Sequence, residues 1–265
     1  MTRYHLIIAG LLAVFLISGC TPNNTRPDTQ DSTGDLGEDT ESPNKGASDI
    51  YVQLAVAYLG QGQMDVALKQ AKKAVDIDST SVDARNVLAL VYDRLGESSQ
   101  AETHFKAGVR AHPKDPYIRN AYGTMLCRQN RFKEADVQFQ AALKNPLYKT
   151  PEVALTNAGI CDLARNDPVQ AEVNLRSALQ RNPRYATALM EMAKLSYENG
   201  EYLSSRAYLQ RYLAVAGPTP SSLWLGIRTE SQLGDRDAVA SYSMMLRNQY
   251  PDSQEIQLLR DWDAR

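Results

Sequence analysis

From residue 48 onward, amphipathic segments alternate with short polar breaks along the chain. Within each segment, apolar and small residues recur three or four positions apart, so they share one face of an α-helix. Several breaks contain a glycine beside polar residues; they lie at 60–62, 95–97, 199–201 and 233–235. The pattern therefore predicts an all-α protein whose helices are joined in pairs by short turns.

The helix pairs repeat with a period of 34 residues. An alanine in the second helix marks the period, at Ala67, Ala101, Ala135 and, after 36 residues, Ala171. A small residue recurs in the first helix and a proline follows several second helices; these are Ala55, Ala89, Gly123, Gly159 and Ala193, with Pro113, Pro183 and Pro251. Small residues allow two helices to approach closely, and proline ends a helix because it has no N–H to donate. This combination is typical of tetratricopeptide (TPR) repeats.

We therefore expect a right-handed superhelical solenoid of six TPR hairpins and a C-terminal capping helix. The units are 48–81, 82–115, 116–151, 152–185, 186–219 and 220–253, and the cap is 254–265. Ser205 and Val239 replace the marker alanine in the last two units. Residues 145–151 make the third unit too long and contain two prolines, so we expect an extended loop, either neutral or a contact element. Trp262 is expected to be buried between the cap and the last repeat.

The first residues have a different character from the repeats. Arg3 precedes an uncharged run at 6–17, which is too short to span a bilayer and indicates a signal peptide at 1–19. The run ends in Leu-Ile-Ser-Gly-Cys at 16–20, which resembles the lipobox of bacterial lipoproteins. Cys20 would then begin the mature protein and carry a diacylglycerol and a fatty acyl chain such as palmitate, which together give a stable anchor. Thr21 after the cysteine resembles a signal for transfer to the outer membrane. The alternative is an ordinary secretory signal with a chance cysteine.

Residues 20–47 are rich in Thr, Asp, Ser, Pro, Asn and Gly, and we expect a disordered tether there. Residues 21–50 carry seven acidic and two basic side chains, whereas 51–265 carry 26 basic and 24 acidic ones. The repeat region is therefore nearly neutral. This balance gives no indication of nucleic-acid binding.

Candidate chemistry is sparse in the mature chain. Cys127 and Cys161 fall near the ends of first helices in adjacent hairpins, so we expect a disulfide, with two buried thiols as the alternative. No C-x-x-C is present and His104 and His112 are the remaining histidines, so we expect no metal site. Nucleophile-elbow, zinc-protease and phosphate-loop motifs are also missing. We expect a protein-binding module with no cofactor, rather than an enzyme.

TPR arrays bind partners along the concave face, at the second, fifth, ninth, twelfth and thirteenth residues of each unit; we call these groove positions. Those of units one to three include an expected exposed apolar strip beside two asparagines: Val52, Val56, Leu59 and Leu90, with Asn86 and Asn120. Amide side chains can both donate to and accept from a peptide backbone. The strip suits an extended or helical segment of a protein partner. In the alternative, the tether or another segment of the chain covers it.

The order of lipobox, polar tether and six TPRs resembles the PilF/PilW-type lipoproteins of type IV pilus biogenesis. Matching segments are YGTMLC at 122–127, RFKEA at 131–135, LTNAGIC at 155–161 and AYLQRYL at 207–213, with the loop around Tyr148. The resemblance implies a pilotin, which binds secretin subunits, brings them to the outer membrane and promotes their assembly into a pore. We expect a monomer on the periplasmic face of that membrane. The alternative is a lipoprotein adaptor that controls a periplasmic peptidoglycan hydrolase or synthase, or a protease.

Overall fold

The computed structural model describes residues 45–264. The predicted signal peptide at 1–19, the predicted lipid attachment at Cys20 and the predicted tether up to residue 44 lie outside the described residues. The described part contains thirteen α-helices and no β-strand. The first helix begins at Lys45, three residues before the first expected repeat unit.

Twelve helices form six hairpins, and the thirteenth follows them. The bounds are α1 (Lys45–Gly60), α2 (Met64–Ile77), α3 (Val82–Arg94), α4 (Ser98–Ala111), α5 (Pro116–Arg128), α6 (Phe132–Leu143), α7 (Pro151–Ala164), α8 (Pro168–Arg181), α9 (Ala186–Glu198), α10 (Tyr202–Ala216), α11 (Pro220–Leu233), α12 (Arg236–Gln249) and α13 (Gln254–Asp263). Proline occupies the first turn of α5, α7, α8 and α11, where its missing N–H costs nothing.

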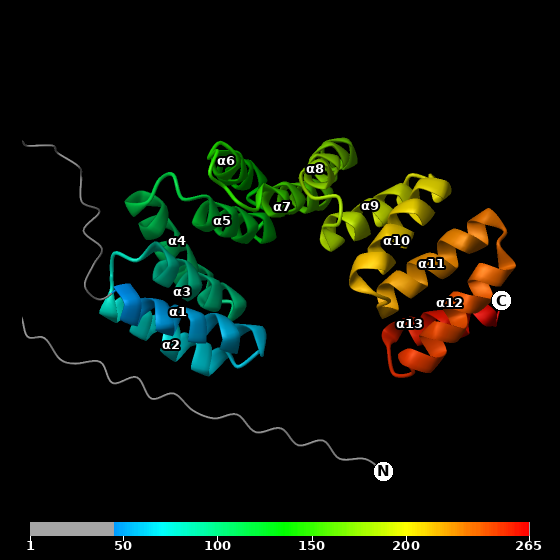
Figure 1. Ribbon diagram of the computed structural model, residues 1–265, viewed down its shortest axis with the longest axis horizontal. Helices are drawn as coiled ribbons and strands as arrows, with labels where there is room; N and C mark the ends of the chain where they lie inside the picture. The colour runs from blue at the N-terminus through cyan, green and yellow to red at the C-terminus, as the bar shows by residue number, and fades with distance from the viewer. Residues whose placement is uncertain (1–44, 265) are drawn as a thin grey trace, which may run out of the picture. The chain divides into compact units, whose positions relative to one another are not determined.

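The hairpins stack into a TPR-type superhelical solenoid, as the sequence predicts (Figure 1). First helices of successive hairpins contact one another, as α3 contacts α5 and α5 contacts α7. Among the described residues, second helices of successive hairpins make no such contact. The stack therefore curves with the first helices on its inner side, and Figure 1 shows α6 and α8 outside α5 and α7.

Small residues close each hairpin. The marker alanines Ala67, Ala101, Ala135 and Ala171 are fully buried. Where a first helix carries glycine, a large side chain of the second helix fills the space: a Cβ on Gly123 would lie 2.8 Å from the ring of Phe139. In the sixth unit the small residue moves one position earlier, to Gly226, whose missing Cβ makes room for Tyr242. The close approach is thus kept although the sequence pattern weakens.

The turn inside each hairpin needs one residue in the left-handed region. Gly96 takes φ +79° between α3 and α4, and glycines occupy the same place in units one, five and six. Units three and four have no glycine there, and Asn130 and Asn166 adopt φ 60° and 65° instead. Asparagine tolerates this conformation better than other residues with a Cβ. All six hairpins therefore share one turn geometry.

Residues 144–150 connect α6 to α7, and the loop is packed rather than loose. The Tyr148 side chain is buried beside Ala142 and Ala154, and its ring meets Tyr117 edge-on with centroids 5.2 Å apart. The Asn145 Nδ2 donates to the Lys114 carbonyl oxygen at 2.8 Å. Pro151, which we expected in the loop, starts α7 because proline fits the first helical position.

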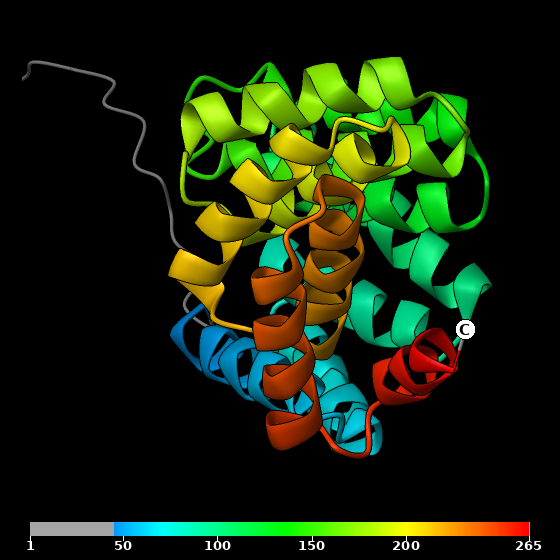
Figure 2. The same cartoon turned by 90° about the vertical axis from the view of Figure 1, so that its right-hand side faces the viewer.

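The cap α13 packs on the last hairpin through Ile256 and Leu259, which are buried with Leu223 and Leu246. Figure 2 shows α13 in red, joined by a turn to the end of α12 in orange. The expectation that Trp262 is buried is wrong: its side chain is 36% exposed. The spacing of Ile256 and Leu259 turns these residues inward, so the Trp262 ring only reaches the edge of Trp224, with centroids 5.8 Å apart.

Candidate functional site

The inner layer of first helices carries the groove positions, so side chains at these positions define the candidate site. Of the predicted strip, Val56 on α1 is open to solvent, with 53% of its side chain exposed. Val52 and Leu59 are half-buried against the cluster around Ala55 and Val87, and Leu90 is half-buried against the next cluster. The strip is therefore less exposed than expected, because neighbouring hairpins cover part of it.

The first helix exposes a second apolar face. Ile50 and Leu54 are exposed, whereas the residues one repeat later, Ala84 and Leu88, are buried against α1 and α2. These positions contact the preceding hairpin in later units, and no helix precedes α1 among residues 45–264. Within the described range, this face is thus the end of the repeat stack that no helix covers.

The two predicted amide groups differ in how they are bonded. The Asn120 Oδ1 accepts a hydrogen bond from Asn157 Nδ2 at 3.0 Å, so this oxygen is used inside the protein. The Asn86 Oδ1 is buried and has no donor within the described region. The structure therefore places the two asparagines on adjacent first helices without making them an equivalent pair.

Charged groove residues pair across units. The Arg128 guanidinium on α5 forms an ion pair with the Asp93 carboxylate on α3. Partial burial lowers the pKa of Arg128, although the group stays cationic at neutral pH. Partial burial and the nearby charges of Asp115 and Asp49 raise the pKa of Asp83. In units one to three, the groove therefore carries negative charge near Asp49 and Asp83. The positive charge of Arg128 is compensated by Asp93.

Cys127 and Cys161 form a disulfide between α5 and α7 in the structure, with Cα atoms 5.7 Å apart. This separation lies within the usual range for disulfides. Cys127 occupies a groove position, so the bond ties two first helices together at the middle of the candidate site.

A pocket of about 200 Å³ opens between α9 and α11, in the fifth and sixth units. Seven of the eight lining residues occupy groove positions; the eight are Met190, Lys194, Tyr197, Glu198, Ser221, Trp224, Leu225 and Arg228. The Arg228 guanidinium carbon lies 4.6 Å from the Tyr197 ring centroid and 5.7 Å from that of Trp224. Stacking on aromatic faces holds this cation by cation–π attraction.

The groove residues predicted from the sequence lie in the first three units and do not include this pocket. The same count in units five and six gives Tyr197, Trp224 and Arg228, and aromatic residues and arginine are the types most often critical at interfaces. The residue types at the groove positions of units five and six could therefore have indicated this pocket from the sequence.

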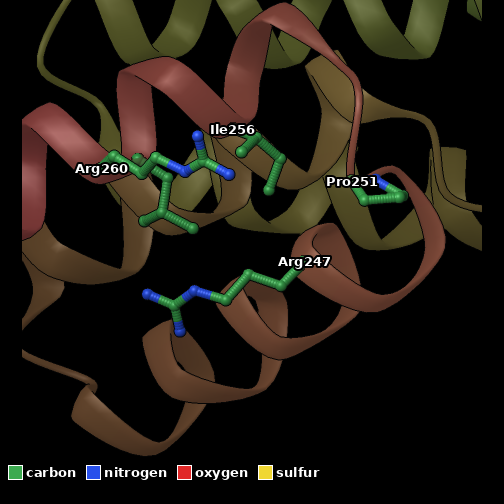
Figure 3. Close-up of a pocket in the computed structure, with 5 residues that line it drawn as sticks. Arg247, Pro251, Ile256 and Arg260 are labelled. Carbon is green, nitrogen blue, oxygen red and sulfur yellow. The ribbon is translucent and has the colours of Figure 1, made fainter.

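Another pocket, of about 240 Å³, lies between α12 and α13 (Figure 3). Arg247 of α12 and Ile256 and Arg260 of α13 line it, and Figure 3 shows the two guanidinium groups on opposite sides. Arg247 already pairs with Asp263. None of its lining residues is at a groove position, so this pocket belongs to the packing of the cap.

No group of three or more His, Cys, Asp or Glu side chains within residues 45–264 is placed to hold a metal ion. None of the helices in the same range combines the length and the apolar composition needed to cross a bilayer.

Comparison with known proteins gives consistent matches. A tetratricopeptide repeat family model matches residues 58–125 and 162–224. The chain is 31% identical over 252 residues to the type IV pilus assembly protein PilF of Pseudomonas aeruginosa. The alignment covers 95% of this chain and 98% of that protein. It is 30% identical over 115 residues to an uncharacterised Haemophilus influenzae protein, covering 43% of this chain and 64% of that protein.

Solved structures agree with the sequence matches. The P. aeruginosa PilF structure superimposes with a TM-score of 0.71 at 31% identity, covering 83% of this chain and 99% of that one. PilW, described as a widely conserved type IV pilus biogenesis factor, gives a TM-score of 0.71 at 29% identity, with 80% and 98% covered. The similarity thus extends over nearly the full length of both structures.

Proposed function

This chain belongs to the family of type IV pilus assembly TPR proteins that includes PilF and PilW, and we propose that it acts as an outer-membrane pilotin. In this role it binds secretin subunits in the periplasm, brings them to the outer membrane and promotes their assembly into the pore for the pilus. The observation that carries the proposal is the alignment with PilF over 95% of this chain. TPR hairpins alone are shared by many unrelated proteins, whereas a match over nearly the whole length is specific.

The inner face of the solenoid supports a binding role. First helices in direct contact with one another form a continuous surface, stiffened at its middle by the disulfide between Cys127 and Cys161. Such a preformed surface loses little conformational freedom when a partner binds. A non-enzymatic scaffold that holds a segment of another protein fits this design.

The proposed lipid anchor would bring the bound secretin subunit to the outer membrane. A lipid on Cys20 would attach the protein to the outer membrane, and residues 20–44 would connect the lipid to α1. A bound secretin subunit would then be carried to the membrane by the lipid. Two or more acyl chains would keep the complex attached there, because they prefer the membrane to water.

A deletion strain tests the proposal. Loss of the protein should abolish detergent-resistant secretin multimers in the outer membrane, and the wild-type gene should restore them. The secretin subunit should also co-purify with the protein from solubilised envelopes. Normal secretin multimers in the deletion strain, with a peptidoglycan enzyme or protease co-purifying instead, would favour the adaptor function.

A single exposed side chain tests the first-unit strip. Val56→Glu should weaken secretin binding by about 1–2 kcal/mol, because burying a charge in place of a valine loses apolar contact. Val169→Glu is the matched control, since Val169 is 75% exposed on the second helix α8, outside the inner layer. Val52 and Leu59 are unsuitable because they pack against the core. Equal affinity of both variants, measured by calorimetry, would exclude the strip as a contact surface.

A further inference from the structure

Arg228 lies on the inner face between two aromatic rings. It sits at the ninth position of the sixth unit, and its guanidinium stacks over Tyr197 of α9 and Trp224 of α11. The two rings hold the side chain in one orientation, toward the pocket between these helices. An arginine fixed in this way has lost little freedom that binding would still have to remove.

The hydrogen-bonding capacity of Arg228 is not used by the described residues. Its Nε is buried from solvent and has no acceptor there, and no ion pair joins Arg228 to any carboxylate within residues 45–264. The nearest acid along α11, Glu230, is bonded instead to Arg206 of α10. A guanidinium prefers two parallel bonds to one carboxylate, and a buried N–H without an acceptor is unfavourable.

Some other arginines of the solenoid bond to carboxylates across units. Arg128 pairs with Asp93, and Arg165 pairs with Asp136 of the preceding hairpin. At Arg228 the part of the chain from 45 to 264 provides the cation and the aromatic rings but no carboxylate. The described residues therefore leave a position at Arg228 that a carboxylate can fill.

The other charged side chains that line the pocket do not pair with Arg228. The Lys194 ammonium bonds to the Glu191 carboxylate at 2.8 Å, so these two charges compensate each other. Glu198 also lines the pocket, and it forms no ion pair with Arg228. Met190, Tyr197 and Trp224 supply apolar walls. The pocket thus has one available cation within an aromatic and aliphatic wall.

We propose that the pocket between α9 and α11 is a docking subsite for a protein segment whose Asp or Glu carboxylate binds Arg228, with an adjacent apolar side chain against Met190 and Trp224. This inference rests on the proposed binding of a secretin subunit, and it identifies the segment as acidic. The volume of about 200 Å³ admits side chains of an extended segment but no folded element. The subsite lies in units five and six, at the opposite end of the inner face from Val56 in unit one.

Paired peptides test the subsite. Overlapping peptides from the secretin subunit are prepared with each Asp or Glu and with the Asn or Gln counterpart. Binding is followed by tryptophan fluorescence in a Trp262→Phe background, so that the signal comes from Trp224. A tryptophan in the pocket should respond directly when a side chain enters. The wild-type protein should bind at least one acidic peptide about tenfold or more tightly than its amide counterpart, since a bond to a charged group is worth roughly that ratio.

Arg228→Gln should abolish the preference between the two peptides of such a pair, and Arg228→Lys should retain part of it. Arg211→Gln is the matched control, because Arg211 also stacks on a tyrosine, Tyr208, but lies on the second helix α10. It should keep the full preference. Combining Arg228→Gln with the acid-to-amide change in the peptide gives a double-mutant cycle, which isolates the bond between the two groups. If Arg228 had only a structural role, its replacement would weaken the binding of both peptides equally.

The outcomes separate the two proposals. If Arg228→Gln retains the preference for the acidic peptide, or lowers binding of both peptides equally, the subsite is refuted. If intact secretin subunit binds the wild-type protein and Arg228→Gln with equal affinity, the subsite is refuted and the pilotin role stands. If no secretin peptide or subunit binds, the pilotin role fails. A model peptide pair with Asp or Asn between two phenylalanines then decides the subsite, which is refuted if wild type shows no preference for Asp.

Discussion

Individual side chains determine how closely the two helices of a hairpin approach. Gly123 and Gly159 face Phe139 and Leu175, so a large residue on one helix is matched by a missing side chain on the other. Ser205, which replaces the marker alanine in unit five, is buried and donates to the Ala193 carbonyl oxygen at 2.9 Å. The hydroxyl is accommodated because this bond satisfies it.

Gly123→Ala should destabilise the protein by about 1–3 kcal/mol, because the new methyl group would overlap the buried ring of Phe139. Gly60→Ala is the control, since a Cβ there meets nothing within 4 Å. Its effect should stay within about 0.5 kcal/mol. Urea unfolding of both variants measures the difference. Equal stability of the two variants would show that the hairpin can open at Gly123 without cost.

His104 should make stability depend on pH. Burial, together with the positive charge of Arg85, lowers the pKa of His104, and its Nδ1 is buried without a partner among the described residues. As the pH falls below the ordinary value of about 6.5, the unfolded chain takes up a proton before the folded one, so stability decreases. His104→Phe keeps a ring beside Tyr92 and cannot titrate. The free energy of unfolding should therefore fall less between pH 7.5 and 5.5 in this variant; parallel curves would contradict the account.

Helices are held to one another by more than apolar packing. Ion pairs connect successive hairpins, as between Arg165 and Asp136, and the Arg131 guanidinium bonds to Glu102 of the preceding hairpin at 2.8 Å. These pairs are only partly buried, and ion pairs that keep contact with solvent contribute little individually. The covalent link between α5 and α7 is the strongest single constraint that the described helices share.

Peptide mapping without reductant should recover Cys127 joined to Cys161. The cysteines are 34 residues apart, and a loop of this size predicts a stabilisation of roughly 3–4 kcal/mol in the chain-entropy model. Reduced protein and the double variant Cys127→Ala, Cys161→Ala should therefore unfold at similar, lower urea concentrations. Two thiols that react freely with an alkylating reagent in the untreated protein would contradict the prediction.

The whole array works as one surface because first helices contact one another from the first unit to the sixth. Local changes at Val56 and Arg228 should therefore act on the same partner through opposite ends of the groove. The proposed lipid anchor adds a further requirement, since the surface must be held at the membrane where the secretin assembles.

Cys20→Ala should release the protein from the outer membrane without unfolding the repeats, because Cys20 precedes every described helix. Fractionation in high salt measures the release, and circular dichroism of the purified variant should match that of the wild type. Secretin multimers should be lost from the outer membrane even though the variant still binds the subunit. A variant that stays in the membrane fraction would refute the lipid anchor.

Short-range patterns were enough to predict the helices, their pairing and their order. The spacing of apolar residues reflects contacts within one helix, and the marker alanines such as Ala101 reflect contacts between a helix and its partner in the hairpin. The closeness of Cys127 and Cys161 could be anticipated for the same reason, since residues one repeat apart lie on neighbouring first helices. Asn130 and Asn166 replace the turn glycine because either residue can adopt the left-handed conformation.

Exposure in the groove could not be read from these patterns. Val52, Val56 and Leu59 share one helix, yet the packing of α3 against α1 leaves Val56 open and partly covers the other two. Trp262 was expected inside and lies at the surface, because Ile256 and Leu259 take the buried side of α13. The pocket around Arg228 exists because Tyr197 and Trp224 come together from two hairpins. Such features depend on the angle between neighbouring hairpins and on side-chain rotamers, which the packing of the whole stack sets.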